Sequence, residues 1–132
     1  MLLTLVTPQK KLIINEEVEY VSVPGFRGEL TIYTGHSPLV TTLDIGVLEY
    51  VKKGSSEKLK HSISWGYCEV AGDKVKVLAE SAESKETLDF ERVEKSIKAS
   101  EQAIDSGELD PEQIEKYLNK LRKAEVRKSI KN

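Results

Sequence analysis

The sequence lacks most of the residues and patterns on which catalysis, metal binding or a membrane anchor depends. Its 132 residues include one cysteine, Cys68, and two histidines, His36 and His61. A single cysteine excludes an internal disulfide and is typical of a reducing compartment, and three scattered ligands do not make a zinc cluster. No run approaches the roughly 18 apolar residues of a membrane span, and the N-terminal stretch lacks the basic region of a signal peptide. We expect a soluble intracellular protein without a metal site.

Motifs for catalysis and for phosphate binding are also missing. The sequence has no GxSxG elbow, no GxxxxGK[ST] loop and no GxGxxG fingerprint. A Ser-His-Asp set drawn from Ser37, His36 and Asp44 fails because adjacent strand residues point to opposite faces. The net charge of −2, from 20 basic and 22 acidic residues, provides no bulk attraction to nucleic acid. We predict that the chain is not an enzyme and has no nucleic-acid partner.

The first 86 residues have the pattern of a β domain. Short apolar runs with internal alternation, such as Val18–Val23 and Val75–Leu78, are separated by turn residues. Seven of the eight glycines and three of the four prolines lie in this half, which is typical of many short strands joined by tight turns. We predict an antiparallel β-sandwich of about ten short strands over residues 1–86.

Residues 87–132 change to good helix formers and contain one glycine. Asp89 is a suitable N-cap for a helix from about 90 to 105, and Gly107 suits the left-handed position that ends one. Asp110 followed by Pro111 begins a second helix. The two apolar stripes are Val93, Ile97 and Ile104, and then Ile114, Tyr117, Leu118, Leu121 and Ala124. The short loop predicts an antiparallel two-helix hairpin and so an α+β protein.

Charge is distributed unevenly along the helical half. Residues 80–115 hold 12 acidic and 4 basic residues, whereas residues 116–131 hold 7 basic residues and one acidic residue, Glu125. One interpretation is a solvated helix face with cations near its C-terminus; the other is a docking surface for an acidic partner. The hairpin itself has too thin an apolar stripe to fold alone. It must pack on the β domain or on a partner, either permanently or as a moving part.

One dense segment is the strongest single motif. It reads Pro24-Gly25-x-x-Gly28-Glu29-Leu30-x-Ile32-Tyr33-x-Gly35-His36-x-Pro38-Leu39, and it resembles the signature of the epsilon subunits of bacterial-type F-type ATP synthases. The resemblance continues in order along the chain through these further segments: Val6-Thr7-Pro8, Gly46-Val47-Leu48, Glu69-Val70, Val75-x-Val77-Leu78-Ala79-Glu80-x-Ala82-Glu83 and Leu88-Asp89-x-x-Arg92.

The resemblance implies a non-catalytic subunit of the central stalk, with the same β-sandwich and hairpin. The β-sandwich would bind the gamma subunit and the rotor ring of c subunits, and so help to couple proton translocation to ATP synthesis. The implied contacts with the ring and stalk are Glu29, Tyr33, His36 and Pro38. The subunit would lie at the cytoplasmic face of the bacterial inner membrane, peripheral to it through the complex, and would require no cofactor.

The resemblance also gives the hairpin a regulatory role. In the family the hairpin permits turnover when it is folded against the β-sandwich. When it extends along gamma, it reaches an acidic segment of beta among the alpha and beta catalytic subunits and inhibits ATP hydrolysis. The residues assigned to that inhibitory contact are Arg122, Lys123, Arg127 and Lys128.

Some bacterial members of the family bind ATP as a regulatory ligand that keeps the hairpin folded. Their pattern, [IL]-D-x-x-R-A, is matched here except that Val93 replaces alanine, and Ala99 stands where a further arginine would help. The implied ATP-binding residues are Glu83, Asp89, Arg92, Arg122 and Arg127. The alternative is that Asp89 is only a helix cap and Arg92 only a surface residue.

Two other functions remain as rivals to the stalk subunit. The first is a stand-alone ATP-binding sensor, in which the free chain is the functional form. The second is an enzyme that uses His36, although no base and nucleophile pair is visible.

The Trp65-Gly66 pair departs from the family, which commonly has two glycines there. Tryptophan disfavours a positive φ. We therefore expect either a different local turn or a pocket for the indole ring.

Overall fold

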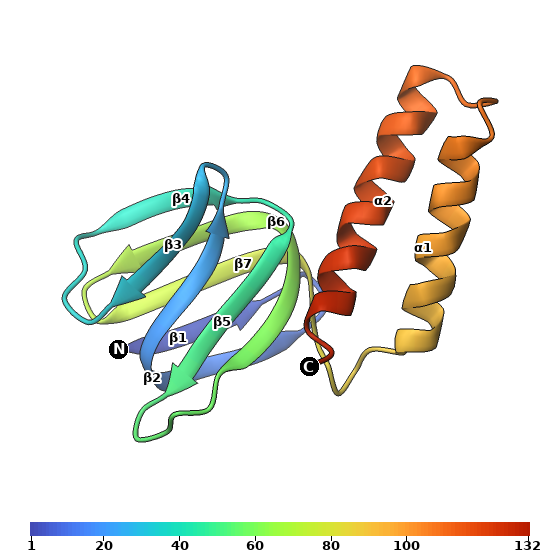
Figure 1. Ribbon diagram of the computed structural model, residues 1–132. Helices are drawn as coiled ribbons and strands as arrows, with labels where there is room; N and C mark the ends of the chain where they lie inside the picture. The colour runs from blue at the N-terminus through green and yellow to red at the C-terminus, as the bar shows by residue number, and fades with distance from the viewer.

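The computed structural model describes all residues from Met1 to Asn132. Seven strands precede two helices (Figure 1). The strands are β1 (Leu2–Val6), β2 (Lys11–Gly25), β3 (Gly28–Tyr33), β4 (Leu39–Leu43), β5 (Gly46–Lys52), β6 (Leu59–Ala71) and β7 (Lys74–Ser84). The helices are α1 (Phe90–Asp105) and α2 (Pro111–Ser129).

The seven strands form one sheet that folds over on itself into a sandwich-like β domain. The strand order is β1-β7-β6-β4-β2-β3, with β5 bridging β2 and β6 and with β1 also pairing with β2. Every pairing is antiparallel except the parallel pair β1–β7. Sixteen buried side chains fill the interior, among them Leu3, Val21, Ile32 and Leu48, each with no exposed surface. The α+β fold, a β-sandwich followed by an antiparallel hairpin, is therefore confirmed.

The number of strands differs from the ten or so expected, because single long strands replace pairs of predicted short ones. β6 pairs with β5 through residues 59–63 and then with β4 through residues 66–70. Trp65 lies at this change of partner with a φ of 36°, so the strand bends there without ending. β2 similarly runs through Asn15, whose φ is 47°. Long strands that serve two neighbours need such a bend to follow the fold of the sheet.

The ends of both helices are where their capping residues predict them. The Asp89 side chain accepts a hydrogen bond from the backbone N–H of Arg92, and Gly107, with a φ of 73°, follows α1. Asp110 and Gln113 form a reciprocal capping box at the start of α2. These local hydrogen bonds satisfy backbone donors that a helix otherwise leaves unpaired. The expected positions of α1 and α2 are thus confirmed.

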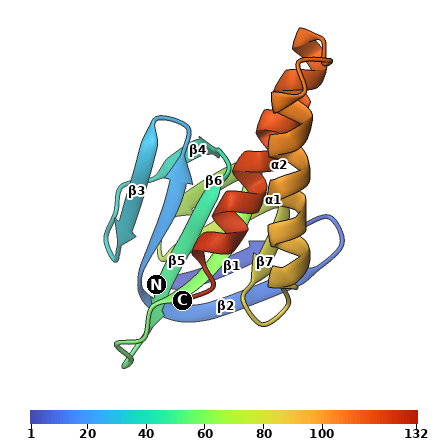
Figure 2. The same ribbon diagram turned by 45° about the vertical axis from the view of Figure 1, so that its right-hand side comes forward.

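The hairpin packs on the β domain mainly through α2, and the two helices pack on each other through a small apolar cluster. Val93, Ile97 and Ala124 form its small buried cluster, while Leu118, which was expected on the apolar stripe, is 46% exposed. Two helices bury only a narrow strip of each other, so the edge of the stripe stays in solvent. The C-terminal half of α2 lies against β5 and β6, and α1 lies beside α2 on the outside (Figure 2). Neither helix is long and apolar enough to cross a membrane.

Candidate functional site

A pocket lies where the hairpin meets the β domain, and we call it the hairpin-base pocket. Its volume is about 420 Å³. It is formed by the end of β7, the linker, the first turns of α1 and the C-terminal half of α2. The lining residues are Glu83, Thr87, Leu88, Asp89, Arg92, Val93, Ser96, Ala124 and Arg127. The structure therefore brings together four of the five residues implied for ATP binding.

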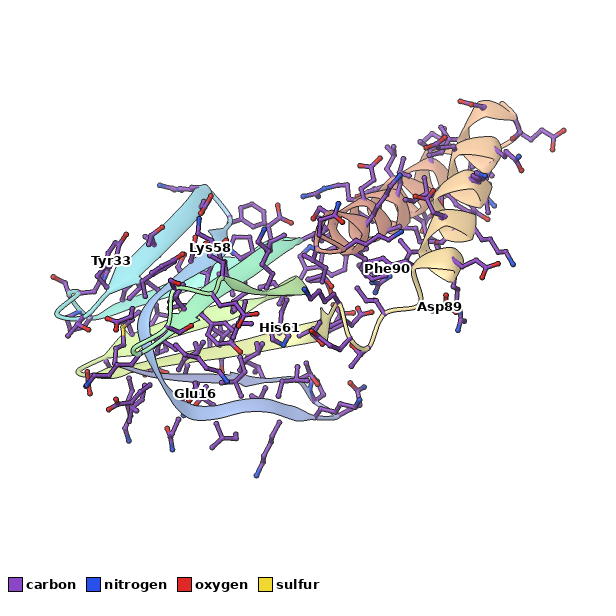
Figure 3. All side chains as sticks on the ribbon, turned by 60° about the horizontal axis from the view of Figure 1, so that its bottom comes forward. Glu16, Tyr33, Lys58, His61, Asp89 and Phe90 are labelled. Carbon is purple, nitrogen blue, oxygen red and sulfur yellow. The ribbon has the colours of Figure 1, made fainter.

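The charged groups of the hairpin-base pocket are partly engaged with one another. Arg127 donates through Nε to Glu83 Oε1 at 3.0 Å, and both side chains are about one-third exposed. Asp89 is occupied as the cap of α1, where its Oδ1 accepts from the Arg92 backbone at 3.2 Å. Figure 3 shows Asp89 and Phe90 together at the start of α1. Two guanidinium groups facing one pocket suit phosphate oxygens, which they bind in a forked geometry.

Arg122 lies outside the hairpin-base pocket. It donates through Nη2 to Asp44 Oδ2 at 3.1 Å, across 78 residues of sequence. Burial would raise the pKa of Asp44, but hydrogen bonds from the Ile45 backbone and from Arg122 outweigh it and hold that pKa below its usual range. Arg122 thus ties α2 to the segment between β4 and β5.

The four bases implied for the inhibitory contact are all engaged within the chain, and we call them the basic quartet. They are Arg122, Lys123, Arg127 and Lys128, and their partners are Asp44, Trp65, Glu83 and Glu94 respectively. The first three partners belong to the β domain or the segments that join its strands. Three of the four bases therefore hold the hairpin against the β domain.

Lys128 instead joins the two helices. Its Nζ donates to Glu94 Oε1 of α1 at 2.6 Å. This hydrogen bond raises the pKa of Lys128 and lowers that of Glu94. Because both groups are exposed, the pair contributes little to the stability of the hairpin.

The four residues implied for ring and stalk contact do not form one cluster. Glu29 lies at the start of β3, where it accepts a hydrogen bond from Ser22 Oγ at 2.5 Å. Tyr33, His36 and Pro38 lie at the other end of β3 and in the loop that follows. Four residue steps along β3, from Glu29 to Tyr33, separate the two ends by about 13 Å. Figure 3 places Tyr33 at the end of the β domain that is remote from Asp89 and α1.

The loop after β3 is a tight, locally bonded turn. The His36 backbone N–H donates to the Tyr33 carbonyl at 3.1 Å, and Gly35 supplies a φ of 86°. The His36 ring donates through Nδ1 to the Ser37 carbonyl at 2.7 Å. The Tyr33 ring is 60% exposed and lies 5.8 Å from the Tyr20 ring. The loop therefore presents an aromatic ring on a stiff backbone.

Trp65 takes the positive φ that tryptophan disfavours, and its half-buried side chain contacts α2. The Lys123 Nζ lies 4.3 Å from the ring centroid. The ring also lines a shallow apolar pocket of about 320 Å³ with Pro8, Tyr67 and Leu78. Trp65 therefore keeps a positive φ, and its ring lies against Lys123 beside an open pocket and is not enclosed in one.

The sequence analysis did not pair the basic quartet with its partners in the folded chain, although it named Glu83 and Trp65 for other reasons. Asp44 and Glu94 carry no motif, and their partners are remote in sequence, so no local pattern predicts them. Trp65 did carry a signal, because it departs from the family pattern at a position that favours glycine.

Burial limits the reactivity of two further side chains, Cys68 and His61. Burial raises the pKa of the Cys68 thiol to about 11, so it stays protonated and unreactive at neutral pH. Burial also lowers the pKa of His61, whose ring stacks on Tyr50 at 6.2 Å and whose Nδ1 has no hydrogen-bond partner. No three side chains of His, Cys, Asp or Glu gather in an arrangement that could hold a metal ion.

The β domain and the whole chain both have relatives among known proteins. The family model described as ATP synthase, Delta/Epsilon chain, beta-sandwich domain, matches residues 1–85. The ATP synthase epsilon chain of Bdellovibrio bacteriovorus is 42% identical over 104 residues, which cover 79% of this chain and 74% of that one. The ATP synthase epsilon chain of Geotalea uraniireducens is 36% identical over 126 residues, which cover 96% of this chain and 89% of that one.

Solved structures are similar in fold over the whole chain. A chain of the Euglena gracilis mitochondrial ATP synthase, in a structure of its OSCP/F1/c-ring, has a TM-score of 0.85 and 22% identity, with coverage of 98% of this chain and 79% of that one. A chain of the Tetrahymena thermophila mitochondrial ATP synthase central stalk and c-ring has a TM-score of 0.61 and 15% identity, with coverage of 100% and 96%. At these identities the likeness concerns the fold alone.

Proposed function

The chain belongs to the family of bacterial F-type ATP synthase epsilon chains, and from that membership we propose that it couples and regulates the rotary enzyme. Members of this family are non-catalytic subunits of the complex. The proposed role has three parts, which are contact with the gamma subunit and the c-ring, reversible inhibition of ATP hydrolysis, and retention of the folded hairpin by ATP. The proposed location is the cytoplasmic face of the inner membrane, reached through the complex.

For the contact role, the stiff loop after β3 is the supporting feature. A turn whose backbone is already bonded loses little entropy when it docks, which suits a contact that transmits torque. Tyr33, His36 and Pro38 would form one contact and Glu29 a second, some 13 Å away along β3. Two separated contacts resist rotation of the β domain on its partners better than one.

For the inhibitory role, the single observation that carries the proposal is the engagement of the basic quartet in the folded hairpin. Arg122 and Arg127 each pair with a carboxylate of the β domain or its connections, and Lys123 contacts the Trp65 ring. An acidic segment of beta would need the same side chains, so docking on the β domain and docking on beta exclude each other. The folded hairpin is then the permissive state and the extended hairpin the inhibitory one.

For ATP, the supporting feature is the hairpin-base pocket. Its walls come from both helices and from the end of β7, so a ligand bound there would stabilise the folded hairpin over the extended one. Arg127 would exchange Glu83 for phosphate oxygens, and Arg92 would supply a second guanidinium. Arg122 would remain on Asp44 and contribute through docking.

Replacement of Arg92 tests the ATP site. We expect Arg92→Gln to weaken ATP binding by about ten- to a hundredfold, because a charged hydrogen bond to phosphate contributes roughly 1.5–3 kcal/mol. Isothermal titration calorimetry on the full chain measures the change. Lys95→Gln is the matched control, since Lys95 lies on the same helix with its side chain 77% exposed and outside the pocket. Equal affinities for the two variants would contradict the assignment.

The decisive test of the whole role is affinity capture of the tagged chain from a detergent extract of its source cells. We expect stoichiometric recovery of a gamma-like stalk protein with large nucleotide-binding subunits, identified by mass. Recovery of the chain alone, under conditions in which the synthase stays intact, would contradict the role. That outcome together with tight ATP binding would favour the second candidate, a stand-alone ATP sensor. The only structural support for that candidate is the hairpin-base pocket.

A further inference from the structure

We propose that Trp65 is the latch that holds the hairpin down, through the contact of its indole ring with Lys123 of α2. Lys123 belongs to the basic quartet, so the ring engages a side chain that the inhibitory contact would also need. The effect of this contact on ATP hydrolysis rests on the proposed function. Its role in keeping the hairpin docked rests only on the contacts described below.

The position of Trp65 suits a latch. It lies at the bend of β6, where that strand leaves β5 for β4, and α2 lies against β5 and β6 (Figure 2). A φ of 36° is costly for any residue with a side chain. A strained backbone conformation persists where other contacts of the residue offset its cost. For Trp65 the contact between its ring and Lys123 of the hairpin can do so.

The contact itself has the geometry of a cation–π interaction. The Lys123 Nζ lies 4.3 Å from the centroid of the indole ring, well inside the roughly 6 Å limit. The indole is the best of the aromatic acceptors for such a cation.

Arg122 and Arg127 also hold the hairpin beside Trp65, and their ion pairs differ in exposure. The junction of Lys123 and Arg127 with β6 and β7 leaves a void of only about 10 Å³, room for about one water molecule. Arg122 is half exposed in its pair with Asp44, and exposed pairs of this kind contribute little in salt. Trp65 therefore belongs with the docking contacts that should persist at physiological ionic strength, together with the buried Ile130 and the partly buried Arg127–Glu83 pair.

Thiol labelling of the full chain measures the latch. In an Ile130→Cys background the new thiol replaces a side chain that is 2% exposed at the foot of α2, where it lines a pocket with Tyr50, Leu59 and His61. It becomes reactive when the hairpin leaves the β domain. Cys68, fully buried in the β core, reacts only when that core opens. The two thiols therefore report undocking and β-domain opening separately.

We expect Trp65→Gly to raise the labelling rate at position 130 by about fivefold, in line with the strength of a cation–π contact, and to leave the rate at Cys68 unchanged. Glycine adopts the positive φ without strain, so the β domain should not suffer. Lys123→Met should act in the same direction, and the double variant should add little to the larger single effect. Lys120→Met is the matched control, because Lys120 lies over Tyr117 of its own helix, and it should change neither rate.

An unchanged rate at position 130 in Trp65→Gly, or a rise at Cys68 that matches it, would overturn the latch. These outcomes do not depend on the synthase. If labelling rises as expected but hairpin truncation leaves ATP hydrolysis by the assembled enzyme unchanged, the latch stands and the proposed inhibitory role fails.

Discussion

Gly66→Ala is expected to lower the free energy of unfolding of the β domain by about 4 kcal/mol, a large part of the 5–15 kcal/mol typical of a domain. A Cβ at this position would lie 1.9 Å from the Leu78 carbonyl oxygen and 2.9 Å from the Ala79 Cα. Both atoms belong to the backbone of β7, which pairs with β6 on either side of the glycine. The strand cannot move away without the loss of ladder hydrogen bonds, so the clash has no inexpensive relief.

Urea denaturation followed by far-ultraviolet circular dichroism measures this effect. Gly54→Ala is the matched control, since Gly54 also has a positive φ, of 80°, but an added Cβ there meets no atom within 4 Å. The control should cost about 1 kcal/mol for backbone strain alone. Similar losses for the two variants would show that the close approach of β6 to β7 does not decide the stability of this bend.

Neutralisation of the basic quartet is expected to abolish inhibition of ATP hydrolysis in the assembled enzyme. The variant carries Arg122→Gln, Lys123→Gln, Arg127→Gln and Lys128→Gln. Hydrolysis should rise to the level seen with the chain truncated after Glu86, and the salt dependence of inhibition should disappear. Four charges facing an acidic segment act mainly by electrostatic attraction, which salt screens.

The same variant distinguishes the two roles of the quartet, docking on the β domain and contact with beta, because their loss has opposite effects on inhibition. Because three of its members also dock the hairpin on the β domain, undocking should become easier and the labelling of a thiol at position 130 faster. An extended hairpin without inhibition is then the expected result, whereas a hairpin that acts by bulk alone would inhibit more strongly. Lys116→Gln with Lys120→Gln is the control, since both lie in the N-terminal half of α2 outside the quartet. Unchanged inhibition with unchanged salt dependence would remove the quartet from the contact.

Sequence patterns predicted the features of this protein that local chemistry determines. The bounds of α1 and α2 follow from Asp89, Gly107 and Asp110, whose hydrogen bonds and dihedral angles involve only neighbouring residues. The change from β to helical pattern after residue 86 is local in the same sense. The motifs around Glu29 and His36, together with the ordered segments that follow them, were sufficient to indicate the family.

The strand count and the partners of the basic residues were decided by tertiary structure. A strand such as β6 continues through Trp65 because two different neighbours pair with its two halves, and no local propensity contains that information. Arg122 and Asp44 meet across 78 residues, and Trp65 meets Lys123 only because α2 docks on β6. The sequence by itself therefore determined the two helices, the division into a β half and a helical half, and the family. The folded chain decided which charges meet, because opposite charges find partners through the packing of the whole molecule.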